Sequence, residues 1–258
     1  MSVNSYLSTL ASNLVLSSTE KTSITTSINT LKQRLDCYFS NGEIKDKMLF
    51  GSYTRGTILP RKYDNDSDID FMVVFNNPYG YTPQTFLNKL KSFAEHYYSR
   101  SEIHQSSPTI VLELNHIKFD LVPAYKEYSW DTVYQIPNGQ NLWKATEPKT
   151  DDDNLTACNK EHEFIIKPII RLVKLWNIKK NHKSNPSFEI EHNIINNYYF
   201  YCSTYATFLQ AALKNIRTYS NVTKVDEAIA GIEQALMYEN SGMPCTALAE
   251  IKKIFPGD

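Results

Sequence analysis

The pattern of hydrophobic and polar positions is most informative in residues 68–75, where polar and apolar residues alternate over the first four positions and only apolar residues follow. This segment is a short apolar run that opens with two carboxylates, which predicts a buried β-strand. Asp68 and Asp70 are two residues apart, so both project from one face of the strand. The apolar side chains are expected on the other face: Ile69, Met72 and Val74. Like charges on one face are costly unless a cation neutralises them, and hard oxygen ligands suit Mg²⁺ or Mn²⁺.

A third carboxylate follows in residues 111–123, whose pattern predicts two short strands around a tight Asn-His turn. If the second of these strands lies beside residues 68–75, Asp120 comes next to Asp68 and Asp70. Three carboxylates in this arrangement can hold two metal ions about 3.5–4 Å apart. One ion would activate an attacking hydroxyl, and the other would stabilise a triphosphate and its leaving oxygen.

The turn Gly51-Ser52 offers backbone N–H groups and a hydroxyl to phosphate oxygens. Taken alone, this turn is ordinary, and Asp120 alone is an ordinary surface strand residue. Their order along the chain and their apolar flanks together favour in-line nucleotidyl transfer. The alternation of acidic residues from Asp64 to Asp70 also resembles a calcium-binding EF-hand loop. No glycine stands at the sixth position of that loop, and a buried strand follows instead.

A period near 3.6 predicts helices elsewhere in the chain. Ser17-Ser18-Thr19-Glu20 resembles a capping box before a helix of about six turns, and Thr82-Pro83 opens a second helix behind the sheet. Beyond about residue 160 the pattern is helical throughout, with helices expected over 188–217 and 224–238. One apolar stripe surrounds Pro168, which either starts or kinks its helix: Phe164, Ile165, Ile169, Leu172, Val173 and Trp176.

The motifs resemble a known enzyme superfamily. Gly51-Ser52, Asp68-x-Asp70 and Asp120 are similar to the signature of DNA polymerase beta-type nucleotidyltransferases. The segment 171–176, Arg-Leu-Val-Lys-Leu-Trp, resembles the helix that follows the catalytic core in oligoadenylate synthases, cyclic GMP-AMP synthases and bacterial CD-NTases. Residues 187–191 resemble the Ser-Tyr-x-hydrophobic-Glu segment of that branch, with phenylalanine in place of tyrosine. The resemblance is nearest to the bacterial CD-NTases (SMODS nucleotidyltransferases) and spans roughly residues 5–255.

This resemblance implies roles for further residues. Gly51, Ser52 and Arg55 would bind nucleotide, and Lys174 would hold the triphosphate. Ser187 would touch phosphate and Phe188 would stack on a base. Without the resemblance, Lys174 is an ordinary solvated helix side chain, and Phe188 fits a hydrophobic core as well as a base platform. The basic cluster 179–183 is read as a solvated helix end or as a further grip on phosphates.

The expected fold class is α+β, with a polymerase beta-type core of mixed sheet and backing helices and a C-terminal helical lobe. We expect bracing helices over 1–40, the catalytic core over 41–154 and the helical lobe over 155–258, with the nucleotide cleft between the lobes. The acidic, polar segment 148–154 is the expected lobe boundary.

Composition narrows the expected substrates and compartment. The formal net charge of −1 argues against tight binding of long nucleic acids, because such affinity comes from neutralising phosphates. Nucleoside triphosphates are therefore the expected substrates. The four cysteines and six histidines show no metal-ligand spacing. With neither a signal peptide nor a long apolar span, the expected location is a reduced cytoplasm, away from the membrane.

The expected reaction joins nucleoside triphosphates with release of pyrophosphate. By resemblance, the product is a cyclic or short linear oligonucleotide signal in antiphage defence, sensed by a separate effector protein. The three carboxylates serve equally well a nucleotidyltransferase that modifies a small molecule, a tRNA end or a protein hydroxyl. A non-catalytic nucleotide-binding module is the remaining alternative, and such modules usually lack one of the catalytic carboxylates.

Overall fold

The computed structural model describes residues 1–77, 79–128 and 133–257 and divides into two compact units. The sheet unit comprises Ser17–Arg61 and Asn65–Asp153, and the helical unit comprises Met1–Leu16, Lys62–Asp64 and Asn154–Asp258. Helix α5 (Pro148–Glu161) contributes residues to both units. The combination of a sheet with a helical part matches the predicted α+β fold class.

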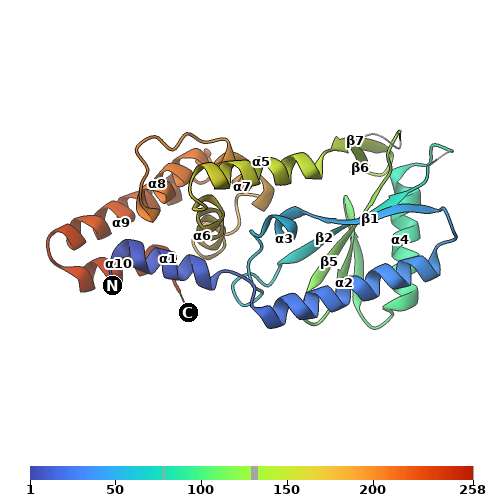
Figure 1. Cartoon of the computed structure of the whole chain (residues 1–258), viewed down its shortest axis with the longest axis horizontal. Coiled ribbons are helices and arrows are strands. Elements are labelled where there is room, and N and C mark those ends of the chain that lie inside the picture. The colour runs from blue at the N-terminus through green and yellow to red at the C-terminus, as the bar shows by residue number, and fades with distance from the viewer. Residues whose placement is uncertain (78, 129–132, 258) are drawn as a thin grey trace. The chain divides into compact units, whose positions relative to one another are not determined.

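The sheet unit is built on five strands in the order β1-β2-β5-β4-β3 (Figure 1). Their bounds are Ile44–Phe50 (β1), Asp68–Phe75 (β2), Glu102–Ser106 (β3), Thr109–Glu113 (β4) and Lys118–Ala124 (β5). Strands β2 and β5 are parallel, and the other neighbouring pairs are antiparallel. A small second sheet contains β6 (Tyr134–Asn138) and β7 (Leu142–Thr146). The predicted strand over 68–75 and the two strands around the Asn-His turn are confirmed.

One face of the five-stranded sheet packs against helix α4 (Pro83–Tyr97). The Phe86 ring of α4 stacks on Phe75 of β2 with 4.7 Å between ring centroids. Helix α4 begins at Pro83, as predicted, because the missing N–H of proline has no helical partner to lose at this position. The predicted capping box is also present, since Ser17 and Glu20 exchange hydrogen bonds at the start of helix α2 (Ser18–Tyr38).

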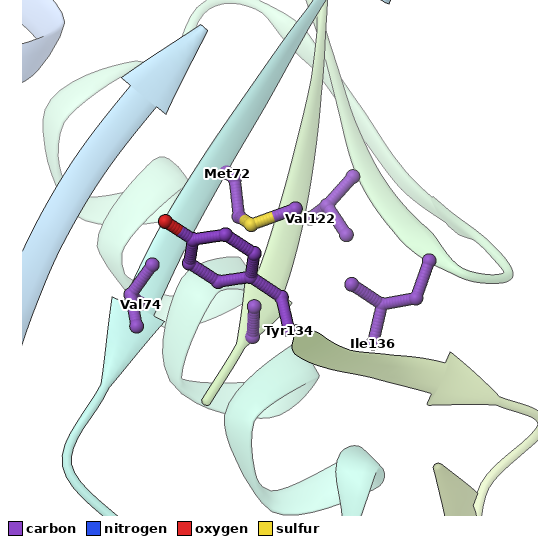
Figure 2. Packing of buried hydrophobic residues seen from close by; sticks show 6 residues of the cluster. Met72, Val74, Val122, Tyr134 and Ile136 are labelled. Carbon is purple, nitrogen blue, oxygen red and sulfur yellow. The ribbon is translucent and has the colours of Figure 1, made fainter. Parts of the chain in front are cut away.

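The opposite face of the sheet carries a hydrophobic cluster beneath β6 (Figure 2). Its buried members are Met72, Val74, Val122, Ala124, Tyr134 and Ile136. The expectation that Met72 and Val74 face away from the aspartates was wrong. They lie two and four residues beyond Asp70, so the pleat places them on the face of the aspartates. This face is therefore polar at the start of β2 and apolar farther along, where β6 covers it.

The helical unit surrounds helix α6, which contacts α1, α7 and α8. The bounds of its remaining helices are Val3–Asn13 (α1), Ile166–Lys179 (α6), Ser187–Ile195 (α7), Tyr205–Asn215 (α8), Val222–Asn240 (α9) and Pro244–Ile254 (α10). The Tyr6 hydroxyl of α1 donates to the carbonyl of Phe255 over 2.6 Å, which ties α1 to the last residues of the unit. No helix in the described part of the chain is long and apolar enough to cross a membrane.

Two helical expectations differ from the structure. Phe164 was expected in the buried stripe but is 67% exposed, because it lies before α6 in a left-handed conformation with φ of 65°. Pro168 falls in the first turn of α6, where proline is tolerated. The expected helical span 188–217 is divided into α7 and α8. Helix α8 begins after an N-cap at Thr204, whose side chain accepts a hydrogen bond from the Thr207 N–H.

Candidate active site

The three predicted catalytic aspartates lie on neighbouring strands of the sheet unit. In the parallel ladder of β2 and β5, Asp70 is paired with Asp120, and Asp68 is paired with Lys118. All four side chains share one face, because one residue separates the two members on each strand. Each of the four is half-buried. The predicted juxtaposition of Asp120 with the first two aspartates is therefore confirmed.

Asp120 occupies an unusual electrostatic position. Its Oδ1 atom is buried and has no hydrogen-bond partner among the described residues. Burial, together with the charges of Asp68 and Glu113, raises the pKa of Asp120 from 3.8 to about 6, against the opposing effects of Lys118 and His104. A buried carboxylate oxygen without a partner is costly. The position therefore suits a ligand for a cation or an acceptor for a proton.

Changing Asp120 to asparagine should alter how stability depends on pH. The pKa of Asp120 is raised in the folded protein, so protonation of this carboxyl stabilises the fold. This contribution to the free energy of unfolding is complete below about pH 4 and is lost as the pH rises through about 6. In EDTA, the wild-type free energy of unfolding should fall by about 1–3 kcal/mol more than that of Asp120→Asn between pH 4 and 7. Urea unfolding at several pH values measures this, and parallel profiles would contradict the assignment. Excess Mg²⁺ should reduce the difference, because a divalent cation favours the ionised carboxylate.

Lys118 is a site residue to which sequence reasoning gave no role. Its Nζ lies 3.2 Å from Oδ2 of Asp68. Burial alone would lower the pKa of Lys118, but the charges of Asp68, Asp120 and Asp66 raise it, so the ammonium stays charged. The sequence contains a signal for this position. Lys118 precedes Asp120 by two residues, so both side chains project from the same face of the strand.

Helix α3 (Gly51–Arg55) begins beside Asp70, because the preceding residue Phe50 is paired with Asp70 in the sheet. Gly51 has a φ of +76°, and a Cβ placed on it would lie 1.8 Å from Oδ2 of Asp70. Glycine alone tolerates both the left-handed backbone and the close carboxylate. The Gly-Ser turn thus lies directly against Asp70.

Replacing Gly51 by alanine should destabilise the protein and displace Asp70. The matched control is Gly42→Ala, because Gly42 has a similar φ of +83° but nothing within 4 Å of the place that a Cβ would occupy. Both variants should lose about 1–2 kcal/mol of unfolding free energy from the left-handed backbone. Only Gly51→Ala should lose more than this and also lose catalytic turnover. Equal stability and turnover in the two variants would show that the contact with Asp70 is unimportant.

The other two predicted residues of this turn differ in exposure. Ser52 is half-buried, and its carbonyl accepts hydrogen bonds from the N–H groups of Thr57 and Ile58. Arg55 is only 7% exposed, and its Nη1 lies 3.4 Å from Oδ1 of Asp152 in α5. Arg55 therefore helps to fix α3 within the sheet unit. The nucleotide-binding roles of Gly51, Ser52 and Arg55 stay predictions.

The metal set also stays a prediction. Across residues 1–77, 79–128 and 133–257, no three His, Cys, Asp or Glu side chains are arranged to hold one ion. The chemistry of Asp68, Asp70 and Asp120 nevertheless fits a hard divalent cation. They offer carboxylate oxygens on one face of the sheet, and one buried oxygen of Asp120 has no hydrogen-bond partner among the described residues.

In the helical unit, Lys174 of α6 is buried, so its interpretation as a solvated side chain is wrong. Its Nζ lies 2.5 Å from Oε1 of Glu191 on α7, and the two side chains are only 6% and 5% exposed. Glu191 belongs to the segment that resembles the CD-NTases, but sequence reasoning gave it no role. A charge pair this deeply buried fixes the position of the ammonium.

Ser187 is the first residue of α7 and is exposed. Phe188 is 53% exposed, and its ring stacks on His192 with 6.1 Å between centroids. The interpretation of Phe188 as a core residue is therefore wrong, whereas a role as a base platform stays a prediction. In the basic cluster, Lys183 Nζ lies 2.6 Å from Oδ1 of Asp64, so its ammonium is partly neutralised.

A network of buried asparagine side chains fixes the connection between α6 and α7. Asn181 Nδ2 donates to Oδ1 of both Asn177 and Asn185, over 2.9 and 2.8 Å. Asn221 Nδ2 also donates to Oδ1 of Asn185, over 2.8 Å. Sequence reasoning missed this network, because Asn221 comes 36 residues after its partner Asn185. It holds the segment that leads directly to Ser187.

The chain is similar to known proteins in sequence and in fold. A probable cyclic nucleotide synthase of Bacillus cereus (strain VD146) is 26% identical over 190 residues, which cover 61% of this chain and 57% of that relative. The chain thus matches little more than half of the relative's length. Two solved structures share the fold at lower identity. CdnC of E. coli MS115-1, in a complex with HORMA, has a TM-score of 0.72 at 15% identity and covers 98% of both chains. The CdnE c-UMP-AMP synthase of Rhodothermus marinus, with Apcpp and Upnpp, has a TM-score of 0.62 at 19% identity, covering 82% of this chain and 81% of that one.

A family model described as "Second Messenger Oligonucleotide or Dinucleotide Synthetase domain" (SMODS) matches residues 1–159. This match includes all three aspartates and the Gly-Ser turn that lies against Asp70. It covers more than half of the chain and confirms the resemblance seen in the sequence. The chain therefore belongs to the SMODS family of bacterial CD-NTases.

Proposed function

We propose that this chain is a template-independent nucleotidyltransferase that joins nucleoside triphosphates into a cyclic or short oligonucleotide and releases pyrophosphate. The observation that carries the proposal is the register of β2 and β5, which sets Asp68, Asp70 and Asp120 on one face of the sheet. Membership of the SMODS family supports this class of product. The nucleotide analogues bound to the structurally similar CdnE support nucleoside triphosphates as substrates.

Asp68, Asp70 and Asp120 are the residues that hold two Mg²⁺ or Mn²⁺ ions in this proposal. Such ions, when bound, neutralise the triphosphate and lower the pKa of the acceptor hydroxyl. Asp120 would hold the ion that activates this hydroxyl, because its buried Oδ1 has no hydrogen-bond partner among the described residues and suits a cation. The N–H groups at Gly51 and the hydroxyl of Ser52 bind phosphate oxygens.

Three residues of the helical unit are also proposed to contact nucleotide. The ammonium of Lys174 contributes positive charge to triphosphate binding, and Glu191 holds this ammonium in place. The exposed hydroxyl of Ser187 contacts phosphate. The exposed ring of Phe188 stacks on a base, an interaction that every nucleobase offers. Arg55 acts mainly through the position of α3, because its side chain is buried against Asp152.

The proposed product acts as a signal in the cytoplasm. A separate effector protein senses it in antiphage defence, and no long nucleic acid or membrane takes part. The near-neutral charge of the chain supports the absence of a long nucleic-acid partner. The complex of the similar CdnC with HORMA supports a search for a protein partner of this chain.

The proposal is tested by incubating the protein with α-labelled nucleoside triphosphates, singly and in mixtures, with Mg²⁺ or with EDTA. Pyrophosphate release and labelled oligonucleotides are expected with Mg²⁺ and not with EDTA. Full turnover in EDTA would contradict the metal assignment. Transfer of label only to an added small molecule, tRNA or protein would replace the oligonucleotide synthase by another nucleotidyltransferase.

A further inference from the structure

Lys118 places a positive charge among the carboxylates of the proposed metal site. It stands opposite Asp68 in the parallel ladder, and its Nζ is 3.2 Å from Oδ2 of that residue. Asp120 lies two residues farther along the same strand and on the same face. The Lys118 side chain is only 20% exposed, so water screens this ion pair less than it screens a surface pair.

The Lys118 ammonium and a divalent cation compete for the same carboxylate, that of Asp68. An oxygen of Asp68 that contacts Lys118 must exchange this contact for a metal bond, and the fixed positive charge repels any cation that approaches. At separations of a few ångströms and reduced dielectric this repulsion is strong. Lys118 also offsets the repulsion between the carboxylates of Asp68 and Asp120, so it stabilises the folded sheet.

We propose that Lys118 is a built-in counter-cation that competes with the divalent metal for Asp68 and thereby weakens metal binding to the protein alone. The inference rests on the proposed nucleotidyl-transfer site. Its consequence is that the metal is retained chiefly when nucleotide phosphates supply further oxygen ligands. Free divalent cation then occupies the site weakly, and metal binding becomes coupled to substrate binding.

The test is Mn²⁺ binding measured by electron paramagnetic resonance, with and without a non-hydrolysable nucleotide. Lys118→Met and Lys118→Gln should each bind Mn²⁺ about tenfold more tightly than wild type without nucleotide. Lys118→Arg keeps the charge and should bind like wild type. The matched control is Lys47→Met. Lys47 also forms an ion pair on this sheet, with Asp36, but it is paired with Val73 and so lies on the opposite face.

Each outcome decides between the alternatives. Tighter binding in the Met and Gln variants, with unchanged binding in Lys118→Arg and Lys47→Met, supports the inference. Equal or weaker binding in the Met and Gln variants overturns it while leaving the proposed metal site intact. Absence of Mn²⁺ binding by wild type, even with nucleotide, would overturn the metal site and this inference together.

A measurement on the unsubstituted protein covers the case in which the variants do not fold. Acylation of lysines, read by mass spectrometry, should increase severalfold at Lys118 as Mg²⁺ and nucleotide are added, because the ammonium is displaced from Asp68. Lys253, whose side chain is 67% exposed in the helical unit, serves as the internal reference. Unchanged or decreased labelling of Lys118 relative to Lys253 would overturn the inference.

Discussion

Replacing Asp70 by asparagine should abolish pyrophosphate release, with a loss of at least about a thousandfold in turnover. Asp70 lies between Phe50 and Asp120 in the sheet and against Gly51, so its carboxylate is at the centre of the proposed site. Asparagine has almost the same shape but carries no charge, so it cannot replace a carboxylate ligand of a divalent cation. Asp68→Asn should have an effect of the same size.

The control for this prediction is Asp66→Asn. Asp66 belongs to the same acidic alternation but is exposed and precedes the start of β2. This variant should keep turnover within a few-fold of wild type. Circular dichroism and urea unfolding check that all the variants are folded. A folded Asp70→Asn that retains substantial turnover would remove Asp70 from the catalytic set.

Breaking the buried pair in the helical unit should have the largest effect on stability. Glu191→Ala removes the carboxylate that lies 2.5 Å from Lys174 and leaves the ammonium buried. We expect a loss of about 3–5 kcal/mol in unfolding free energy, as is usual when one partner of a buried ion pair is removed. The double change Lys174→Met with Glu191→Leu should recover most of this loss, because two apolar side chains replace two buried charges.

The double variant separates folding from nucleotide binding. If Lys174 contacts the triphosphate, the double variant should be folded but bind a non-hydrolysable nucleotide about tenfold or more weakly by calorimetry. The control is Asp226→Ala, which removes an exposed pair with Arg217 at a similar distance of 2.6 Å. It should cost no more than about 1 kcal/mol. A similar loss of stability in Glu191→Ala and Asp226→Ala would contradict the importance of burial.

Local sequence patterns were sufficient for much of the sheet unit. The strand at 68–75, the hairpin that carries Asp120 and the proline at the start of α4 follow from alternation and turn chemistry that act within a few residues. The adjacency of β2 and β5 required one further assumption, that these strands pair. The assignment of Met72 and Val74 to the wrong face came from assuming that all apolar residues oppose the aspartates. One face of a strand can instead be polar at one end and apolar at the other when β6 covers only part of it.

Contacts between residues far apart in the sequence could not be predicted from local patterns. Without the resemblance to CD-NTases, Lys174 fits a solvated helix residue, because its partner Glu191 comes 17 residues later on another helix. The steric need for glycine at position 51 depends on Asp70 of a neighbouring strand. The exposure of Phe164 results from a left-handed backbone before α6, which hydrophobic periodicity does not detect.

The identity of the product decides whether this chain closes nucleotides into a small ring or joins them into a short chain. Wild type and Asp70→Asn are incubated with the four nucleoside triphosphates and Mg²⁺, and the products are treated with phosphatase and identified by mass spectrometry. We expect a product from wild type alone, with a mass that phosphatase leaves unchanged, because a ring has no terminal phosphate. A phosphatase-sensitive product would indicate a linear oligonucleotide. Nucleotide attached to the enzyme or to another protein, with no free oligonucleotide, would show that the chain is not an oligonucleotide synthase.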